Sequence, residues 1–167
     1  WILDPNWPEN GGGLYESSID CSTGALSSPE LLVSTKNAAA LLEADDGLWI
    51  AAREADGISG QIHHWTAHQL SSTDVFGDDD AILSSIVRTV NGTIAVGDTN
   101  EFSGNPTRIG WRNTDGSTGA LAVGDPIRML AAPSAPQVLI LSGYDNATYI
   151  WDGTAVTEPT YVGSAPQ

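Results

Sequence analysis

The chain has 167 residues, 41% of them hydrophobic, and its six Lys and Arg residues stand against 21 Asp and Glu residues for a formal net charge of −15. This length supports one domain with a sizeable core. Binding to a phosphate backbone depends on basic side chains that displace counterions, so the charge excludes nucleic acid as a partner.

Two further features narrow the class of protein. No apolar run is long enough to cross a bilayer and no signal-peptide pattern is present, so we expect no membrane insertion. Cys21 is the single cysteine, which excludes an intrachain disulfide and a thiolate metal cluster. We expect Cys21 to be a small buried side chain.

Residues 1–27 are predicted to form an N-terminal arm. Residues 1–13 contain two Trp, two Pro and three consecutive Gly, a composition typical of an irregular segment. Trp1 and Trp7 would either anchor this arm on a neighbouring subunit or pack back on their own domain. Residues 14–21 alternate weakly between polar and apolar, which predicts a strand and a candidate for the outermost strand that closes a ring.

Residues 28–159 repeat one hairpin. Gly47 begins GLWIAA, Gly92 begins GTIAVG and Gln137 begins QVLILS, so successive copies start 45 residues apart. Each copy leads through a polar loop to a strand that contains a tryptophan. Ala39 to Glu43 is predicted as the innermost strand of its unit. The alanines favour a helix, but the equivalent segment of a later copy is rich in β-branched residues, so the repeat predicts a strand here.

A period in the forties, made of short strands, a turn and an aromatic residue, is typical of β-propeller blades. One blade cannot bury both faces alone, so blades stack and a large aromatic side chain fills the space between them. We therefore predict an all-β, propeller-like array of about three to four blades of antiparallel strands. A β-sandwich or jelly roll is the alternative, because short strands at this spacing also build sandwiches. Residues 160–167 are predicted as a C-terminal tail.

The loops between these strands are expected to form the surface that contacts a partner. Asn91-Gly92 is a strong signal for a two-residue hairpin turn. Residues 70–81 and 98–107 are predicted to be polar loops that present contacts to a partner.

The histidines and one acidic loop are the candidates for metal binding. His63 and His64 are adjacent on a strand and point to opposite faces, so with His68 they do not predict a chelating site. Calcium could find hard oxygen ligands at Asp74, Asp78, Asp79 and Asp80. The alternation of an EF-hand loop is missing there, which favours a solvated acidic loop.

No catalytic constellation is recognisable, so no catalytic, cofactor-binding or metal-binding residue is predicted, and the chain is predicted not to be an enzyme. Paired carboxylates of the glycosidase type stay open, because their separation is invisible in a sequence. The aspartates beside glycine at residues 45–46, 115 and 152 indicate turn chemistry. Asn91 and Asn146 match the N-glycosylation pattern.

Two sets of motifs resemble known repeats. Residues 39–65, AALLEADDGLWIAAREADGISGQIHHW, resemble the blades of bacterial propeller repeats. The motifs NPTRIGW, VGDPI, VLIL and TYIWDG between residues 105 and 153 resemble the propeller domains of tailed-phage tail proteins, such as nozzle and minor tail components. The resemblance implies a structural or attachment part of a virion and carries over no catalytic residue.

Two functional hypotheses follow. The first is a non-enzymatic structural or attachment protein of a virion or cell surface, assembling in multiple copies with other protein subunits. The alternative is a secreted or surface protein with a carbohydrate-binding propeller, or a glycan-active enzyme, in which aromatic rings stack on sugars. The position of four tryptophans distinguishes the two hypotheses: Trp49, Trp65, Trp111 and Trp151. If they are buried between blades, the first hypothesis is favoured, and if several are exposed in one groove, the second is favoured.

Overall fold

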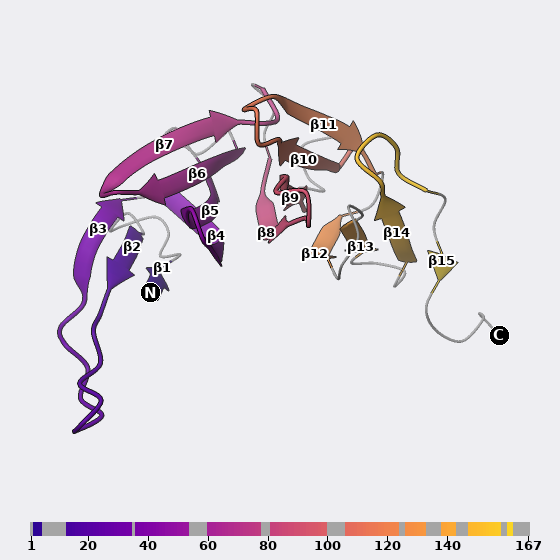
Figure 1. Ribbon diagram of the computed structural model, residues 1–167. Helices are drawn as coiled ribbons and strands as arrows, with labels where there is room; N and C mark the ends of the chain where they lie inside the picture. Colours follow the sequence, from indigo (N-terminus) through magenta and orange to yellow (C-terminus); the bar gives the residue numbers. More distant parts are fainter. Residues whose placement is uncertain are drawn as a thin grey trace.

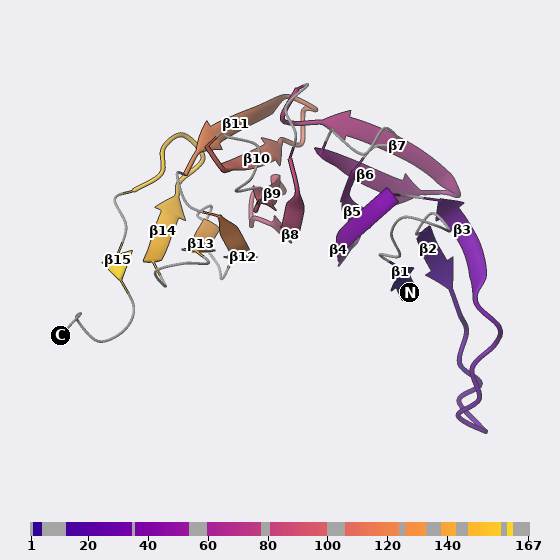
Figure 2. The same ribbon diagram turned by 180° about the vertical axis from the view of Figure 1, so that it is seen from behind.

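The protein is an arc of four β-sheets (Figure 1), seen from behind in Figure 2. The computed structural model describes residues 2–4, 13–34, 36–53, 60–77, 81–99, 106–123, 126–132, 138–142, 147–157 and 160–161. These residues form fifteen strands, and none of them lies in a helix. The described part of the chain therefore contains no helix with the length and apolar character of a membrane span.

Each sheet takes consecutive strands of the chain and pairs them antiparallel. The first sheet contains β1 (Ile2–Asp4), β2 (Gly13–Glu16) and β3 (Glu30–Ser34). The second contains β4 (Lys36–Ala44), β5 (Gly47–Arg53), β6 (Gly60–Thr66) and β7 (Gln69–Asp74). The third contains β8 (Leu83–Arg88), β9 (Ile94–Asp98), β10 (Arg108–Arg112) and β11 (Thr118–Ala122). The fourth contains β12 (Ile127–Ala131), β13 (Val138–Ser142), β14 (Ala147–Trp151) and β15 (Thr160–Tyr161).

The sheets fan out like blades. Strands β4, β8 and β12 lie on the concave side of the arc, and β7 and β11 lie on its outer side (Figure 1). A sandwich would press two sheets face to face, whereas here each inner sheet has a neighbour on both sides. The predicted propeller-like array of about three to four antiparallel blades is confirmed.

The second strand of a blade shows why these sequences fold in this way. In β5, Trp49 faces the third sheet, while Ile50, the next residue, faces the first sheet. In β9, Ile94 and Ala95 divide in the same manner between the second and fourth sheets. Side chains alternate along a strand, so a strand with neighbours on both sides needs apolar residues at every position.

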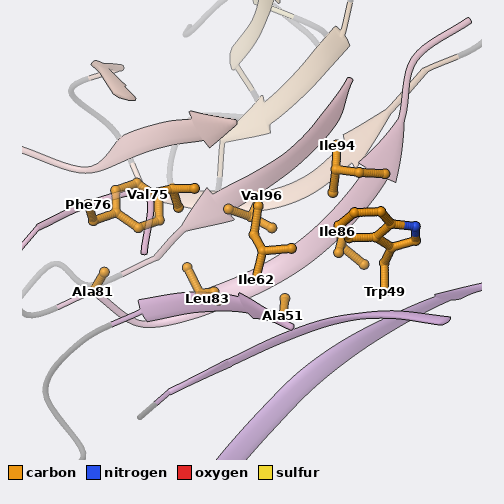
Figure 3. Close-up of a cluster of buried hydrophobic side chains, with 10 residues drawn as sticks. All are labelled: Trp49, Ala51, Ile62, Val75, Phe76, Ala81, Leu83, Ile86, Ile94 and Val96. Carbon is orange, nitrogen blue, oxygen red and sulfur yellow. The ribbon is translucent and has the colours of Figure 1, made fainter. Parts of the chain in front are cut away.

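Three hydrophobic cores fill the spaces between successive blades. Leu14 of the first blade packs with Ile50 of the second. The middle core joins the second and third blades (Figure 3); its buried residues are Trp49, Ala51, Ile62, Val75, Phe76, Ala81, Leu83, Ile86, Ile94 and Val96. The last core joins the third and fourth blades and includes the buried indole of Trp151. The blades are thus held together by stacking, as a repeat protein requires.

The predicted loop at residues 70–81 is partly wrong. Gln69–Asp74 forms β7, the outermost strand of the second blade, and Phe76, which follows it, is buried in the middle core. The segment reads as a loop in the sequence because most of this outer strand is exposed and polar. In the predicted loop at residues 98–107, Asp98 belongs to β9, and residues 100–105 lie outside the described part.

The N-terminal region forms a blade and a projecting hairpin. β2 lies between β1 and β3, and residues 17–29 extend between β2 and β3 away from the four sheets (Figures 1 and 2). Cys21 lies in the turn of this hairpin and is exposed, so its predicted burial is wrong. The turn needs polar groups there: Asp20 accepts hydrogen bonds from the Ser22 and Thr23 hydroxyls.

Several predictions about the ends of the chain stay predictions. Trp1 and Trp7 lie outside the described residues, as do residues 162–167. Thr160–Tyr161, at the start of the predicted tail, pairs with β14. The domain boundaries expected after residues 27 and 159 also remain predictions.

Candidate functional site

An open groove lies on the second blade, at the end of the sheet where β4 turns into β5 and β6 turns into β7. Its volume is about 580 Å³, within the range of ligand sites. Its lining residues are Asp45, Asp46, Gly47, Leu48, Trp65, Thr66, Ala67 and His68. Two acidic residues, a tryptophan and a histidine therefore line one surface.

The two turns bring these side chains together. Gly47 has a φ of +132°, and a Cβ there would collide with the backbone oxygen of Trp65, so only glycine lets the two turns approach so closely. Ala67 and His68 have φ angles of 48° and 62° between the paired residues Thr66 and Gln69. Such two-residue turns normally take Gly, Asn or Asp, because other side chains are strained at positive φ.

Trp65 and His68 form the aromatic wall of the groove. Trp65 is half-buried and its ring centroid lies 6.2 Å from that of His68, at an interplanar angle of 89°. His68 itself is exposed. This wall gives an apolar surface next to the carboxylates of Asp45 and Asp46.

A second cluster beside the groove joins the second blade to the third. The Trp49 ring stacks on His64 with centroids 3.8 Å apart, and its Nε1 donates a hydrogen bond to Asp46 Oδ1 at 3.1 Å. Arg88 Nη1, from the third blade, donates to the same oxygen at 3.1 Å. The Arg112 guanidinium lies 5.3 Å from the Trp49 ring centroid, a cation–π contact.

These contacts set the charge of Asp46. Partial burial raises the pKa of its carboxyl, but the hydrogen bond from Trp49 and the charge of Arg88 outweigh burial, and the pKa lies below its ordinary value. Asp46 is therefore a carboxylate at neutral pH. It can accept hydrogen bonds from hydroxyl groups, whereas a general acid would need a proton to give.

His63 and His64 point to opposite faces, as predicted. His63 is buried on the face toward the first blade, with Nδ1 hydrogen-bonded to Ser72 Oγ at 2.7 Å and Nε2 buried without a hydrogen-bond partner among the described residues. His64 Nε2 donates to the backbone oxygen of Asp46 at 3.0 Å. No three His, Cys, Asp or Glu side chains within the described ranges are placed to hold a metal ion.

We expect His63 to make the protein less stable in mild acid. Burial lowers the pKa of His63 below 6.5, so the unfolded chain binds the proton more readily, and stability present above about pH 6.5 is lost as pH falls. Urea unfolding at about pH 7.5 and about pH 5.5 checks this, since that window contains the histidine titration. His63→Gln should lose less stability over this interval than the wild type, whereas the exposed His68→Gln should lose as much. An unchanged loss in His63→Gln would contradict the assignment.

The aspartates at residues 115 and 152 stabilise the turns in which they lie, as predicted. Asp115 Oδ1 accepts hydrogen bonds from Ser117 N and Oγ at 2.9 and 2.6 Å. Asp152 Oδ1 accepts from Thr154 N and Ala155 N, both at 2.9 Å.

Asp74, a candidate calcium ligand, and Asn91, a candidate glycosylation site, both lie among the described residues. Asp74 Oδ1 accepts from the backbone N–H groups of Phe76 and Gly77, both at 2.9 Å, and Asn91 is exposed in its turn. Their companions, residues 78–80 and Asn146, lie outside the described residues. Calcium binding and glycosylation therefore stay predictions.

The four tryptophans divide between the two functional hypotheses. Trp49 and Trp151 are buried, at 3% and 1% exposure. Trp111 is half-buried and packs on Trp151 with ring centroids 4.9 Å apart. Trp65 lines the groove. All four indoles thus lie at junctions between blades, two of them fully buried, and Trp65 also lines a surface that can take a ligand.

Antiparallel sheets fanned out as stacked blades place the chain in the β-propeller class. The fold is similar to a crystal structure of a catalytically inactive variant of virginiamycin B lyase from Staphylococcus aureus with quinupristin, with a TM-score of 0.66 and 19% sequence identity. The similarity covers 89% of this chain and 48% of that one, so the chain spans about half the length of the lyase. No family profile and no curated protein matches the chain.

This comparison corrects the prediction that the chain is not an enzyme. The propeller that it resembles belongs to a lyase, so neither the fold nor the absence of a recognised motif argues against catalysis. The likeness establishes the fold alone and transfers no catalytic residue. The virion and phage-tail part of the sequence resemblance gains no support, whereas its propeller part does.

Proposed function

We propose that the chain is part of a β-propeller protein that binds a glycan in the groove beside Trp65. The observation that carries this proposal is the half-buried indole of Trp65 lining an open groove next to Asp45 and Asp46. A sugar ring has an apolar C–H face that packs on an aromatic surface, and its hydroxyls donate hydrogen bonds to carboxylates. An open groove suits an extended chain of such units.

The charge of the protein narrows the class of glycan. A net charge of −15 repels acidic sugars, and the groove itself contains two carboxylates. We therefore propose a neutral or amino-sugar glycan as the ligand. Such a ligand agrees with a secreted or cell-surface protein, which is part of the same proposal.

The strained turn at Ala67 and His68 supports the groove as a binding surface. Positive φ angles at two residues that are neither Gly nor Asn cost stability. Strain of this kind concentrates at functional sites, where the side chains it places are needed. Here it places His68 beside Trp65.

Titration calorimetry with neutral, amino-sugar and uronic-acid oligosaccharides tests the proposal. Trp65→Ala should weaken binding of the preferred oligosaccharide by roughly tenfold or more, about 1.4 kcal/mol, whereas Trp65→Phe should keep most of the affinity. Asp45→Asn should also weaken binding. Asp115→Asn is the control for the loss of an exposed turn carboxylate, because Asp115 lies between β10 and β11 of the third blade and outside the groove. Full affinity in Trp65→Ala, or no binding of any neutral or amino sugar, would reject the proposal.

A glycan-active enzyme is the second candidate function. The observation that favours it is the similarity of the fold to that of an enzyme, virginiamycin B lyase. It needs the same groove and adds turnover of the bound glycan. Mass spectrometry of oligosaccharides incubated with the protein distinguishes the two: shortened or unsaturated products indicate an enzyme, and intact ligand indicates binding alone.

A further inference from the structure

The two acidic residues of the groove have different surroundings. Asp46 Oδ1 accepts hydrogen bonds from Trp49 Nε1 and Arg88 Nη1, both at 3.1 Å. Asp45, the preceding residue, is exposed and forms no hydrogen bond or ion pair with any part of the chain that the structure describes. Both oxygens of the Asp45 carboxylate are therefore available to a ligand in the groove.

Two arginines of the third blade lie next to this part of the second blade, but each already has a partner. Arg88 pairs with Asp46, and the Arg112 guanidinium lies over the Trp49 ring. The residues that line the groove are all described, and no Lys or Arg is among them. His68 is the one base in the lining, so with His68 neutral the charge of Asp45 has no counterpart in the groove.

Trp65 is the second group in the groove that attracts a cation. Its indole is half-buried, and a positive charge over the face of an indole is stabilised by the ring. The turn that contains Asp45 lies directly against Trp65, because a Cβ at Gly47 would collide with the Trp65 backbone oxygen. A carboxylate without a partner and an indole therefore lie on adjoining turns of one groove, a pair of groups that suits an ammonium ion.

A sugar with a free amino group can use both of these groups. Its ammonium donates a charge-assisted hydrogen bond to a carboxylate, which is roughly twice as strong as the bond from a neutral hydroxyl. The net charge of −15 also draws cationic ligands toward the protein. N-acetylation removes the positive charge and leaves the apolar face of the sugar ring in place, so it separates the contribution of charge from that of stacking.

We infer that the groove selects glycans with free amino groups, such as oligomers of glucosamine, and that Asp45 is the residue that makes this selection. The ammonium group of one sugar pairs with Asp45 while a sugar ring packs on Trp65. Asp46 does not have this role, because Trp49 and Arg88 already engage it. This inference rests on the proposed glycan function and narrows its ligand from neutral or amino sugars to cationic ones.

Titration calorimetry at low salt compares a glucosamine tetramer with the N-acetylglucosamine tetramer, at a pH at which free amino groups are protonated. The wild type should bind the glucosamine tetramer roughly tenfold more tightly, and added salt should reduce this preference. Asp45→Asn should remove most of the preference but change the affinity for the N-acetylated tetramer by no more than about twofold, because an amide oxygen still accepts a hydrogen bond from a hydroxyl. Asp115→Asn, which makes the same change of net charge outside the groove, should keep the preference. His68→Gln should keep it as well.

The outcomes separate this inference from the glycan proposal. Equal affinity for the two tetramers, with both weakened by Trp65→Ala, would overturn the selection for amino groups and leave the glycan proposal standing. A preference that survives Asp45→Asn, or that is lost equally in Asp115→Asn or His68→Gln, would overturn the role of Asp45. Spermidine has positive charges without sugar rings, so binding as tight as that of the glucosamine tetramer would overturn the inference too. Absence of binding to either tetramer would overturn both proposals. Circular dichroism of each variant confirms that it is folded.

Discussion

Replacing Gly97 with valine should lower the free energy of unfolding by about 3 kcal/mol, the upper end of the usual cost of overpacking a core. A Cβ at Gly97 would lie 2.5 Å from Ile127 Cγ2 and 3.0 Å from Ser85 Oγ. Ile127 is fully buried in β12, the innermost strand of the fourth blade, and the Ser84 hydroxyl bonds to its backbone oxygen at 2.6 Å. Ile127 cannot move away without separating the third and fourth blades, and Ser85 is the residue that pairs with Gly97 inside the third blade.

Urea unfolding measures this change, and Ala122→Val is the matched control. Ala122 is exposed on the outer strand of the same blade, so its stability should change by no more than about 0.5 kcal/mol. In the pair Gly97→Ala and Ile127→Ala, the new methyl group occupies part of the space that Ile127 leaves, so the double variant should be more stable than the sum of the two single changes predicts. Additive effects, or a Gly97→Val variant as stable as wild type, would show that the blades do not approach closely at this glycine.

The sequence predicted the positions of the strands better than it predicted which neighbouring blade each side chain contacts. The spacing of 45 residues places the hairpins correctly, because each copy contains the second strand of a blade, namely β5, β9 and β13. The faces differ, however, because the alternation of side chains holds only within a strand. Trp49 faces the next blade, whereas Ile94, 45 residues later, faces the previous one, since residues 45–46 connect β4 to β5 but the longer segment 89–93 connects β8 to β9.

The tryptophans of the third strands show the same change of face. Trp65 pairs with Leu48 and packs toward the first blade, but Trp111 pairs with Ala95 and packs toward the fourth. His64, which pairs with Trp49, occupies the place that corresponds to Trp111. The indoles are thus inter-blade contacts without being copies at one position, because loops of different length change the register between strands.

The candidate groove was only partly visible in the sequence. The acidic turn at residues 45–46 was recognised as a turn, but its contact with Arg88 joins residues 42 positions apart and depends on blade stacking. The turn at Ala67 and His68 carries no Gly or Asn, the usual signal of a two-residue hairpin. The strand that follows it, β7, therefore has no turn signal before it in the sequence.

Replacing Trp49 with alanine should have the largest effect of any single substitution discussed, a loss of about 3–5 kcal/mol in the free energy of unfolding. The indole is 3% exposed, lies in the middle core with Ile86 and Ile94, and stacks on His64 (Figure 3). Its removal leaves a cavity between the second and third blades. It also removes one of the two hydrogen bonds that Asp46 Oδ1 accepts from Trp49 and Arg88.

Two other substitutions separate these contributions in the same urea experiment. Trp65→Ala removes the same side chain from a half-buried position, so it should cost less, about 1–2 kcal/mol for the smaller apolar area. Trp49→Phe fills most of the cavity but cannot donate to Asp46, which should cost about 1–2 kcal/mol at neutral pH. Without that donor the pKa of Asp46 rises toward its ordinary 3.8, so Trp49→Phe should lose less of its remaining stability than the wild type as the pH falls through this range. If Trp49→Ala and Trp65→Ala cost the same, the stacking of blades around Trp49 would not be the main source of stability at this junction.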